Sequence, residues 1–209
     1  MTAAIVKGTL AGLAYGLLLG PLFFLGLQVT LKKGLRYGIA LALGAFISDA
    51  ALAVGGWWSS ARLMAMLQQD TFQSVLGLIG SLLIIGFGIS AIWPKKERAP
   101  GAVIEGVARR RYSFMKGFAL NMANPSNWLF WFGLAAAARA DAPLEDPYYT
   151  FIFLAAALAM VLTTDVAKVV LANQIGERLG PGIPGKIVRL AGIVLIGVGV
   201  WLLVNIFWG

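Results

Sequence analysis

Three ionisable side chains, those of Asp49, Asp165 and Lys168, lie within long apolar stretches of the sequence. A charged side chain at the centre of a bilayer costs about 3 kcal/mol or more, so such residues usually face a polar interior and help to move ions or substrates. Asp49 has no cationic residue near it in the sequence. We therefore expect a carboxyl group that takes up and releases a proton near neutral pH. The structural alternative is a neutral carboxyl group bonded to a neighbouring helix.

Asp165 and Lys168 are three residues apart, which brings them together on one face of a helix. Two interpretations of this pair are open. In the functional one, Asp165 does from the second half of the chain what Asp49 does from the first. In the structural one, the pair only neutralises itself, and Lys168 extends towards the membrane surface.

Three asparagines surround Pro125 in the middle of the apolar stretch 113–138. Proline has no backbone N–H, and its ring crowds the carbonyl group of Asn121. In lipid that carbonyl group needs another donor, which the side-chain amides of Asn121, Asn124 and Asn127 can supply. The pattern predicts a helix that breaks or bends at mid-depth, where transporters bind their cargo. A tolerated kink with self-satisfied asparagines is the alternative.

Gly20 and Pro21 form a second break of the same kind. Gln28 lies seven residues after Pro21, on about the same helix face, so we expect it to line one polar cavity together with the asparagines. Trp128 and Trp131 either wall that cavity or pack against neighbouring helices. Packing is the simpler role for large aromatic side chains.

Glycine occurs at every fourth position of the first apolar stretch, at positions 8, 12, 16 and 20. On a helix these residues form one flat stripe, against which another backbone can lie very close. The stripe predicts tight packing, either within one chain or between two copies in a homo-oligomer.

Apolar stretches account for nearly the whole chain. Of its 209 residues, 59% are hydrophobic and 12% are charged, whereas soluble domains have about 25% charged residues. A hydrocarbon core of ~30 Å needs about 20 helical residues. The sequence therefore predicts one all-α polytopic membrane domain over 1–209, without a removed signal peptide. The predicted spans are 10–31, 37–58, 74–93, 113–138, 148–172 and 187–208. A basic linker covers 94–112, either without regular structure or with one short interfacial helix.

The Lys and Arg residues divide unequally between the two sides of such a protein. Three fall on the side of the termini: Lys7, Arg62 and Arg139. Thirteen fall on the other side, at positions 32, 33, 36, 95, 96, 98, 109–111, 116, 178, 186 and 189. Basic loops stay in the cytoplasm, so both termini are predicted to lie outside, in the periplasm. Contact with anionic membrane lipid explains the net charge of +8 without nucleic acid.

Absent residue types exclude several chemistries. The chain has no Cys and no His, which excludes disulfides, thiol redox chemistry and the commonest transition-metal ligand. The sequence also shows no metal-ligand cluster, phosphate-binding loop or nucleophile–base pair. We therefore predict that the chain is not an enzyme and that it needs neither a metal nor another cofactor.

The second half of the sequence repeats features of the first in the same order. Pro125 corresponds to Pro21, Asp165 corresponds to Asp49, and Gly-x-Gly at 197–199 corresponds to Gly-x-Gly at 86–88. Each half has three spans, an odd number, so the halves enter the membrane in opposite directions. The prediction is an inverted repeat of about 1–93 and 113–209, with its first and fourth helices broken or kinked at the two prolines.

Several of these residues stand in a familiar order. The first half has Leu19-Gly20-Pro21, a basic turn over 31–38 and the segment 43–49 that ends in Ser48-Asp49; the second half has Gly-Phe-x-x-Asn-x-x-Asn-Pro over 117–125. Together these elements resemble the signature of the LysE/RhtB family of amino-acid exporters, over the whole six-span length. The resemblance implies inverted three-helix repeats and export of small metabolites, chiefly amino acids, driven by a proton gradient or the membrane potential.

Two hypotheses follow. In the first, the chain is a secondary exporter in the cytoplasmic membrane of a bacterium, with an amino-acid-like substrate and protons as its partners. Helix ends at the breaks offer N–H groups to a carboxylate and carbonyl groups to an ammonium group. The predicted site residues are Gly20, Pro21, Gln28, Asp49, Asn121, Asn124, Pro125, Asp165 and Lys168. In the second hypothesis, the chain is a membrane scaffold or accessory subunit whose interior is closely packed.

Overall fold

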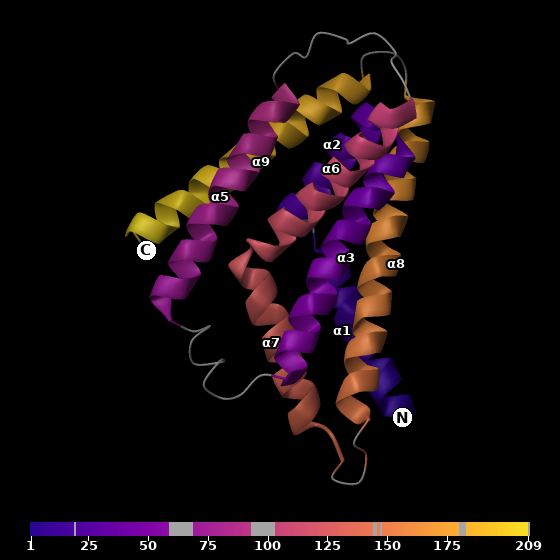
Figure 1. The fold of residues 1–209 in the computed structure, drawn as a ribbon, viewed down its shortest axis with the longest axis vertical. Helices are drawn as coiled ribbons and strands as arrows, with labels where there is room; N and C mark the ends of the chain where they lie inside the picture. Colours follow the sequence, from indigo (N-terminus) through magenta and orange to yellow (C-terminus); the bar gives the residue numbers. More distant parts are fainter. Residues whose placement is uncertain are drawn as a thin grey trace.

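The computed structural model consists of helices and their connections (Figure 1). It describes residues 1–18, 20–58, 69–92, 103–143, 146, 148–179 and 183–208, and within these ranges there is no strand. The helices are α1 (Thr2–Gly16), α2 (Pro21–Lys33), α3 (Leu35–Trp58), α5 (Asp70–Ile92), α6 (Val103–Met122), α7 (Pro125–Ala140), α8 (Tyr149–Arg178) and α9 (Ile183–Trp208). The predictions for Leu19, Arg62, Lys95, Lys96, Arg98 and linker residues 94–102 lie outside the described residues.

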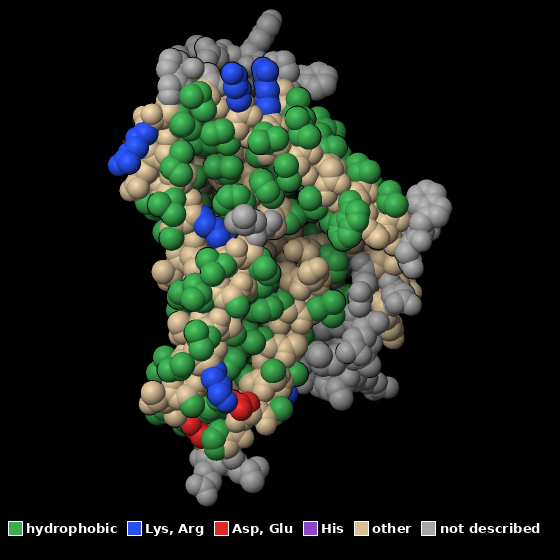
Figure 2. Space-filling model, turned by 180° about the vertical axis from the view of Figure 1, so that it is seen from behind, with side chains coloured by type: hydrophobic (Ala, Val, Ile, Leu, Met, Phe, Trp, Pro, Cys, Tyr) green, Lys and Arg blue, Asp and Glu red, His purple; other side chains and the backbone are tan. Residues whose placement is uncertain are grey.

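Among the residues that the structure describes, three helical segments are long and apolar enough to cross a membrane: α3, α8 and the part Gly185–Ile206 of α9. The helices α1 and α2 meet the same criterion together, as one pair bent by 69°. Figure 2 shows a broad surface of hydrophobic side chains between two ends at which charged side chains gather. The chain is therefore an integral membrane protein. Six spans remain a prediction, because α5, α6 and α7 are not among the candidate spans found in the described residues.

Both predicted helix breaks are present. The helix α1 ends at Gly16 and α2 begins at Pro21, and α6 ends at Met122 and α7 begins at Pro125. Each proline occupies the first turn of its helix, where its missing N–H has no intrahelical partner to lose. The prolines therefore start new helices, and the polypeptide changes direction just before each of them.

The start of α6 differs from the sequence prediction. Residues 103–112 were predicted to belong to the linker, but α6 begins at Val103 and continues without interruption into the predicted span that starts at residue 113. Helical hydrogen bonds do not depend on lipid, and the three arginines at 109–111 are good helix formers. The described part of the linker is thus an extension of the helix.

Each of three helices packs chiefly against one that is distant in the sequence: α1 on α8, α3 on α6, and α5 on α9 (Figure 1). Glycines permit these close contacts. A Cβ atom at Gly8 or Gly12 would overlap the backbone of α8. The glycine stripe therefore packs within one chain, with the exception of Gly20, around which a Cβ atom would meet nothing within 4 Å.

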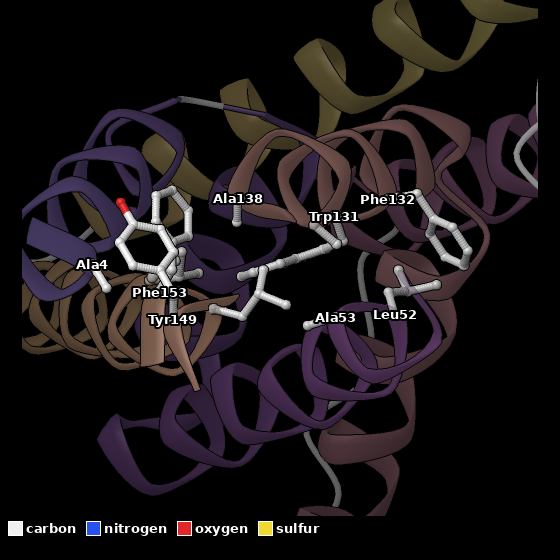
Figure 3. Packing of buried hydrophobic residues seen from close by; sticks show 12 residues of the cluster. Ala4, Leu52, Ala53, Trp131, Phe132, Ala138, Tyr149 and Phe153 are labelled. Atoms are coloured by element: carbon white, nitrogen blue, oxygen red, sulfur yellow. The ribbon is translucent and has the colours of Figure 1, made fainter. Parts of the chain in front are cut away.

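The main hydrophobic core lies where α3, α7 and α8 meet (Figure 3). Trp131 of α7 is fully buried there, among Leu52 and Ala53 of α3 and Phe153 of α8. Burying a side chain of this size contributes several times more than a single buried methyl group. The core thus fixes α7 against α3, the helix that carries Asp49.

One end of the molecule is held together by charged groups. The Nζ atom of Lys7 lies 2.8 and 2.7 Å from the two carboxylate oxygens of Asp141, and the Tyr149 hydroxyl donates to the same carboxylate. Arg139 donates a hydrogen bond to the carbonyl group of Trp57. The contacts of Lys7 tie α1 to the segment between α7 and α8, and the hydrogen bond of Arg139 ties the end of α7 to the end of α3.

Basic and aromatic side chains lie together where the end of α2, the start of α3 and the end of α5 come close to Tyr112 of α6. Lys32 donates to the carbonyl group of Ala91 at 2.6 Å. The Nζ atom of Lys33 lies 5.9 Å from the ring centre of Tyr37 and 5.7 Å from that of Tyr112. Such cation–aromatic clusters are typical of the level of the lipid head groups.

We expect the Lys7–Asp141 contact to stabilise the protein only above strongly acidic pH. Hydrogen bonds from Lys7 and Tyr149 hold the pKa of Asp141 below its ordinary value of 3.8. A lowered pKa in the folded state gives stability that is present above the ordinary value and is lost as the pH falls through the folded-state value. Asp141→Asn should therefore lower the melting temperature slightly at pH 7, because an exposed pair contributes little. A melting-temperature difference that persists well below pH 3.8 would contradict this explanation.

Candidate functional site

Asp49 lies in the middle of α3 and is only 2% exposed. Its Oδ1 atom accepts three hydrogen bonds: from Asn121 Nδ2 at 2.8 Å, from Asn127 Nδ2 at 3.0 Å and from Trp131 Nε1 at 2.7 Å. Among the residues that the structure describes, none donates a hydrogen bond to Oδ2. One oxygen therefore holds the carboxyl group in place, and the other remains able to bind a proton or a cationic group.

The break before Pro125 brings two of these donors to Asp49. Asn121 lies in the last turn of α6 and Asn127 in the first turn of α7. Asn127 Nδ2 also donates to the backbone carbonyl of Asn121 at 3.2 Å. A side-chain amide thus satisfies the carbonyl group that the proline leaves without its helical partner, as the sequence predicted. The side-chain amide of Asn127 therefore both satisfies the backbone at the break and binds the Asp49 carboxylate.

Two helix N-termini are formed at the breaks. Asn124 caps α7, because its side-chain oxygen accepts a hydrogen bond from the backbone N–H of Ser126 at 3.1 Å. Gly20 precedes α2 and brings no side-chain cap. The first turn of a helix has unpaired N–H groups and a partial positive charge, both of which attract an anion.

Tyr15 of α1 joins this network through Asn127. Its hydroxyl donates to Asn127 Oδ1, and its ring stacks on that of Phe130, with 3.8 Å between the ring centres. A chain of hydrogen bonds therefore runs from Tyr15 on α1 through Asn127 on α7 to Asp49 on α3. A movement of α1 would therefore change the position of Asn127 and with it the hydrogen bond to the Asp49 carboxyl group.

A cavity of about 330 Å³ lies between the helices, and both breaks open into it. Eight of the nine predicted site residues line it: Gly20, Pro21, Asp49, Asn121, Asn124, Pro125, Asp165 and Lys168. Its volume lies at the lower end of the range for small-molecule sites. The structure therefore brings together residues that the sequence placed in both halves of the chain.

Gln28 is the predicted site residue that does not line the cavity. It is buried at 4% exposure, and its Oε1 atom has no hydrogen-bond partner among the described residues. The prediction assumed that the face of α2 on which Pro21 lies is the face that borders the cavity along the whole helix. Pro21, Leu22 and Phe23, at the start of α2, all border the cavity whichever face of the helix they lie on. Further along the helix the lining residues are Gly26 and Leu27. Gln28 follows Leu27 and points about 100° away from it.

Asp165 and Lys168 form an ion pair with 3.1 Å between Oδ1 and Nζ. Both residues line the cavity, and their side chains are 16% and 21% exposed. Lys168 therefore pairs within the wall of the cavity. Asp165 is thus paired with a cation, whereas the groups that donate to Asp49 are neutral.

The sequence prediction overlooked one contributor, Tyr15, and gave two others, Asn127 and Trp131, roles that differ from those in the structure. Tyr15 was not recognised, although a hydroxyl group next to the glycine stripe in an apolar helix is a detectable signal. Asn127 was expected to line the cavity but lies at 0% exposure, where it holds Asp49. Trp131 packs as predicted and in addition donates to Asp49. Neither Trp131 nor Trp128 is among the cavity-lining residues.

The arrangement is suited to binding and proton exchange. In the described part of the chain there is no cluster of three His, Cys, Asp or Glu residues that would hold a metal ion.

A family model for LysE type translocators matches residues 13–206, which include both proline breaks and both intramembrane aspartates. The chain belongs to this family. Searches among curated proteins and among solved structures found no match. As a LysE type translocator, the chain is a membrane exporter with a small-molecule cargo.

Proposed function

We propose that this translocator exports amino acids from the bacterial cytoplasm in exchange for protons. The observation that carries the proposal is the unpartnered Oδ2 of Asp49, in the wall of a cavity that lies between two helix breaks. An amino acid presents an ammonium group to that oxygen and a carboxylate to the N-terminus of α7. Both charged groups of the cargo then find a partner within one small cavity.

Proton coupling follows from competition for Asp49. The ionised carboxylate attracts the ammonium group, whereas a proton on Oδ2 removes that attraction. Cargo and proton therefore bind Asp49 alternately. Asp49 is bound to the cargo in one half of the transport cycle and to the proton in the other half. The hydrogen bonds to Oδ1 keep the carboxyl group in the same place in both states.

The packing of the helices supports an inverted repeat. If α1, α2, α3 and α5 correspond to α6, α7, α8 and α9, the contact of α1 with α8 corresponds to that of α6 with α3. Both contacts are among the main helix pairs. The basic cluster around Lys33 at one end supports a cytoplasmic position for that end, and hence termini in the periplasm. Rocking of one half against the other then exposes Asp49 to each side in turn.

The scaffold hypothesis predicted a closely packed interior without a polar cavity. A cavity of about 330 Å³ that reaches two aspartates and a lysine argues against it. A structural protein gains nothing from keeping such groups at a cavity wall, where each costs free energy.

The test is an efflux measurement. The protein is overproduced in a bacterial host that is sensitive to amino-acid accumulation, and the amino acids that leave the cells are measured against cells with an empty vector. We expect faster efflux of at least one amino acid, and efflux that slows when the proton gradient is dissipated. Unchanged efflux of every amino acid, with the protein present in the membrane, would contradict the proposal.

Tyr15→Phe tests whether the hydrogen-bond chain positions Asp49 for transport. The variant keeps the stacked ring and removes only the hydroxyl that donates to Asn127. A neutral hydrogen bond contributes about 1 kcal/mol, so we expect a transport rate about fivefold lower and a melting temperature lower by about 2–4 °C. The pH dependence of transport should also shift, because Asn127 is then less firmly held against Asp49. If the variant has the same pH dependence of transport as the parent protein, Tyr15 contributes only to packing.

A further inference from the structure

The two helix breaks that border the cavity differ in chemistry. The break at α7 is polar, with the side chains of Asn121, Asn124 and Ser126 among the lining residues. The break at α2 is mostly apolar. Its lining residues are Tyr15, Gly16, Leu18, Gly20, Pro21, Leu22, Phe23, Gly26 and Leu27, and the one hydroxyl among them, that of Tyr15, donates to Asn127. An inverted repeat would place equivalent residues at both breaks. Their difference indicates that the two walls contact different parts of the cargo.

The charges that line the cavity set a second condition. Within the described residues they are Asp49, Asp165 and Lys168, and the last two neutralise each other at 3.1 Å. One ammonium group on the cargo compensates Asp49. A basic side chain would bring a second cation without a partner, and an acidic side chain would face two carboxylates. The cavity therefore suits a cargo with one ammonium group, one carboxylate and no further charge.

We infer, on the basis of the proposed function, that the cargo is an amino acid with a bulky, uncharged, apolar side chain. Its charged groups lie between Asp49 and the N-terminus of α7, and its side chain lies against the α2 wall. Apolar residues from other helices, such as Ile84 of α5 and Leu202 of α9, extend that wall. Burial of an aliphatic or aromatic side chain against this surface supplies binding free energy that a small or polar side chain lacks.

Gly20 sets the size limit for that side chain. It lines the cavity, and a Cβ atom there would meet no heavy atom within 4 Å, so the space beside it is open. Its φ of −88° is ordinary for any L residue. An alanine at position 20 therefore displaces no protein atom, and each carbon atom added there takes space beside the cavity from the cargo.

The cargo class is tested by binding to the purified full-length protein in detergent. The melting temperature is measured with leucine, phenylalanine, alanine, lysine or glutamate at equal concentration, since a ligand that binds the folded state raises it. We expect the largest rise with leucine or phenylalanine and little change with lysine or glutamate. A larger rise with lysine or glutamate than with leucine would overturn the inference.

Gly20→Ala and Gly20→Val test the size limit by exchange in proteoliposomes. Labelled leucine, phenylalanine and alanine are compared for each variant. We expect exchange of leucine and phenylalanine to fall by about tenfold in the valine variant, less in the alanine variant, while exchange of alanine persists. The matched control is Gly133→Val, because Gly133 also faces open space but does not line the cavity. An equal loss for all three amino acids, or the same loss in the Gly133 variant, would refute the role of Gly20.

The two proposals fail in different ways. If the protein exchanges lysine but not leucine, the proposal of amino-acid transport is supported and the inference of an apolar cargo is refuted. Stabilisation by leucine without exchange of any amino acid would leave the cargo class standing and remove transport. Neither stabilisation nor exchange with any amino acid would refute both.

Discussion

Asp49→Asn is expected to abolish transport while the protein still folds and inserts into the membrane. The substitution keeps the size of the side chain and an oxygen that can accept from Asn121, Asn127 and Trp131. It replaces Oδ2, the unpartnered oxygen, by an NH₂ group that neither binds a proton nor attracts an ammonium group. Loss of a charged hydrogen-bond partner costs about 3 kcal/mol, so transport should fall by about 100-fold or more.

The measurement combines two readouts. Amino-acid exchange is followed in proteoliposomes, and the elution profile and melting temperature of the same preparation report on the fold. The matched comparison is Asp49→Ala, which leaves three buried N–H donors without an acceptor and should destabilise the protein by about 1–3 kcal/mol for each. Full exchange by the asparagine variant would remove Asp49 from the mechanism and reduce it to a structural acceptor.

The partners of Asp49 explain why only part of the site could be predicted from the sequence. Asn121, Asn127 and Trp131 lie 72, 78 and 82 residues away from Asp49 in the chain. No local pattern links positions so far apart, so Asp49 was predicted as an unpartnered carboxyl group. Only Oδ2 fits that description. The burial of Asp49, by contrast, was predictable from its apolar neighbours.

Features that depend on local chemistry were predicted well. Both breaks follow from the absence of an N–H in proline, and the one before Pro125 also from the capping capacity of asparagine. These effects act within a few residues. Gln28 shows where this reasoning fails. The helical period fixes which residues share a face, but the direction of that face depends on how α2 packs against other helices. That packing is decided by contacts with α3, α8 and α9 rather than by the sequence of α2.

Gly117→Ala is expected to destabilise the protein strongly, although it adds a single methyl group. Gly117 of α6 lies against α3, and a Cβ atom there would overlap the carbonyl oxygen of Leu41. The contact is reciprocal, because a Cβ atom at Gly44 of α3 would overlap the carbonyl oxygen of Phe114. Backbone atoms cannot rotate away as side chains do, so α3 and α6 must separate, at a cost of about 1–3 kcal/mol.

Separation of α3 from α6 also acts on the transport site. Asn121 of α6 donates both to Asp49 at 2.8 Å and to the carbonyl of Ala45 at 3.0 Å. A shift of a few tenths of an ångström weakens both hydrogen bonds. Transport should therefore fall together with the melting temperature, even though Gly117 is not among the residues that line the cavity.

The control is Gly86→Ala in α5, where the added Cβ atom would meet nothing within 4 Å. Alanine exceeds glycine in helix stability by about 0.5–1 kcal/mol, so this variant should melt at an equal or higher temperature than the parent. The same change from glycine to alanine is thus expected to have opposite signs at two helix positions. Equal melting temperatures for the two variants would mean that the α3–α6 contact is not close enough to depend on glycine, and that the position of Asn121 opposite Asp49 has another cause.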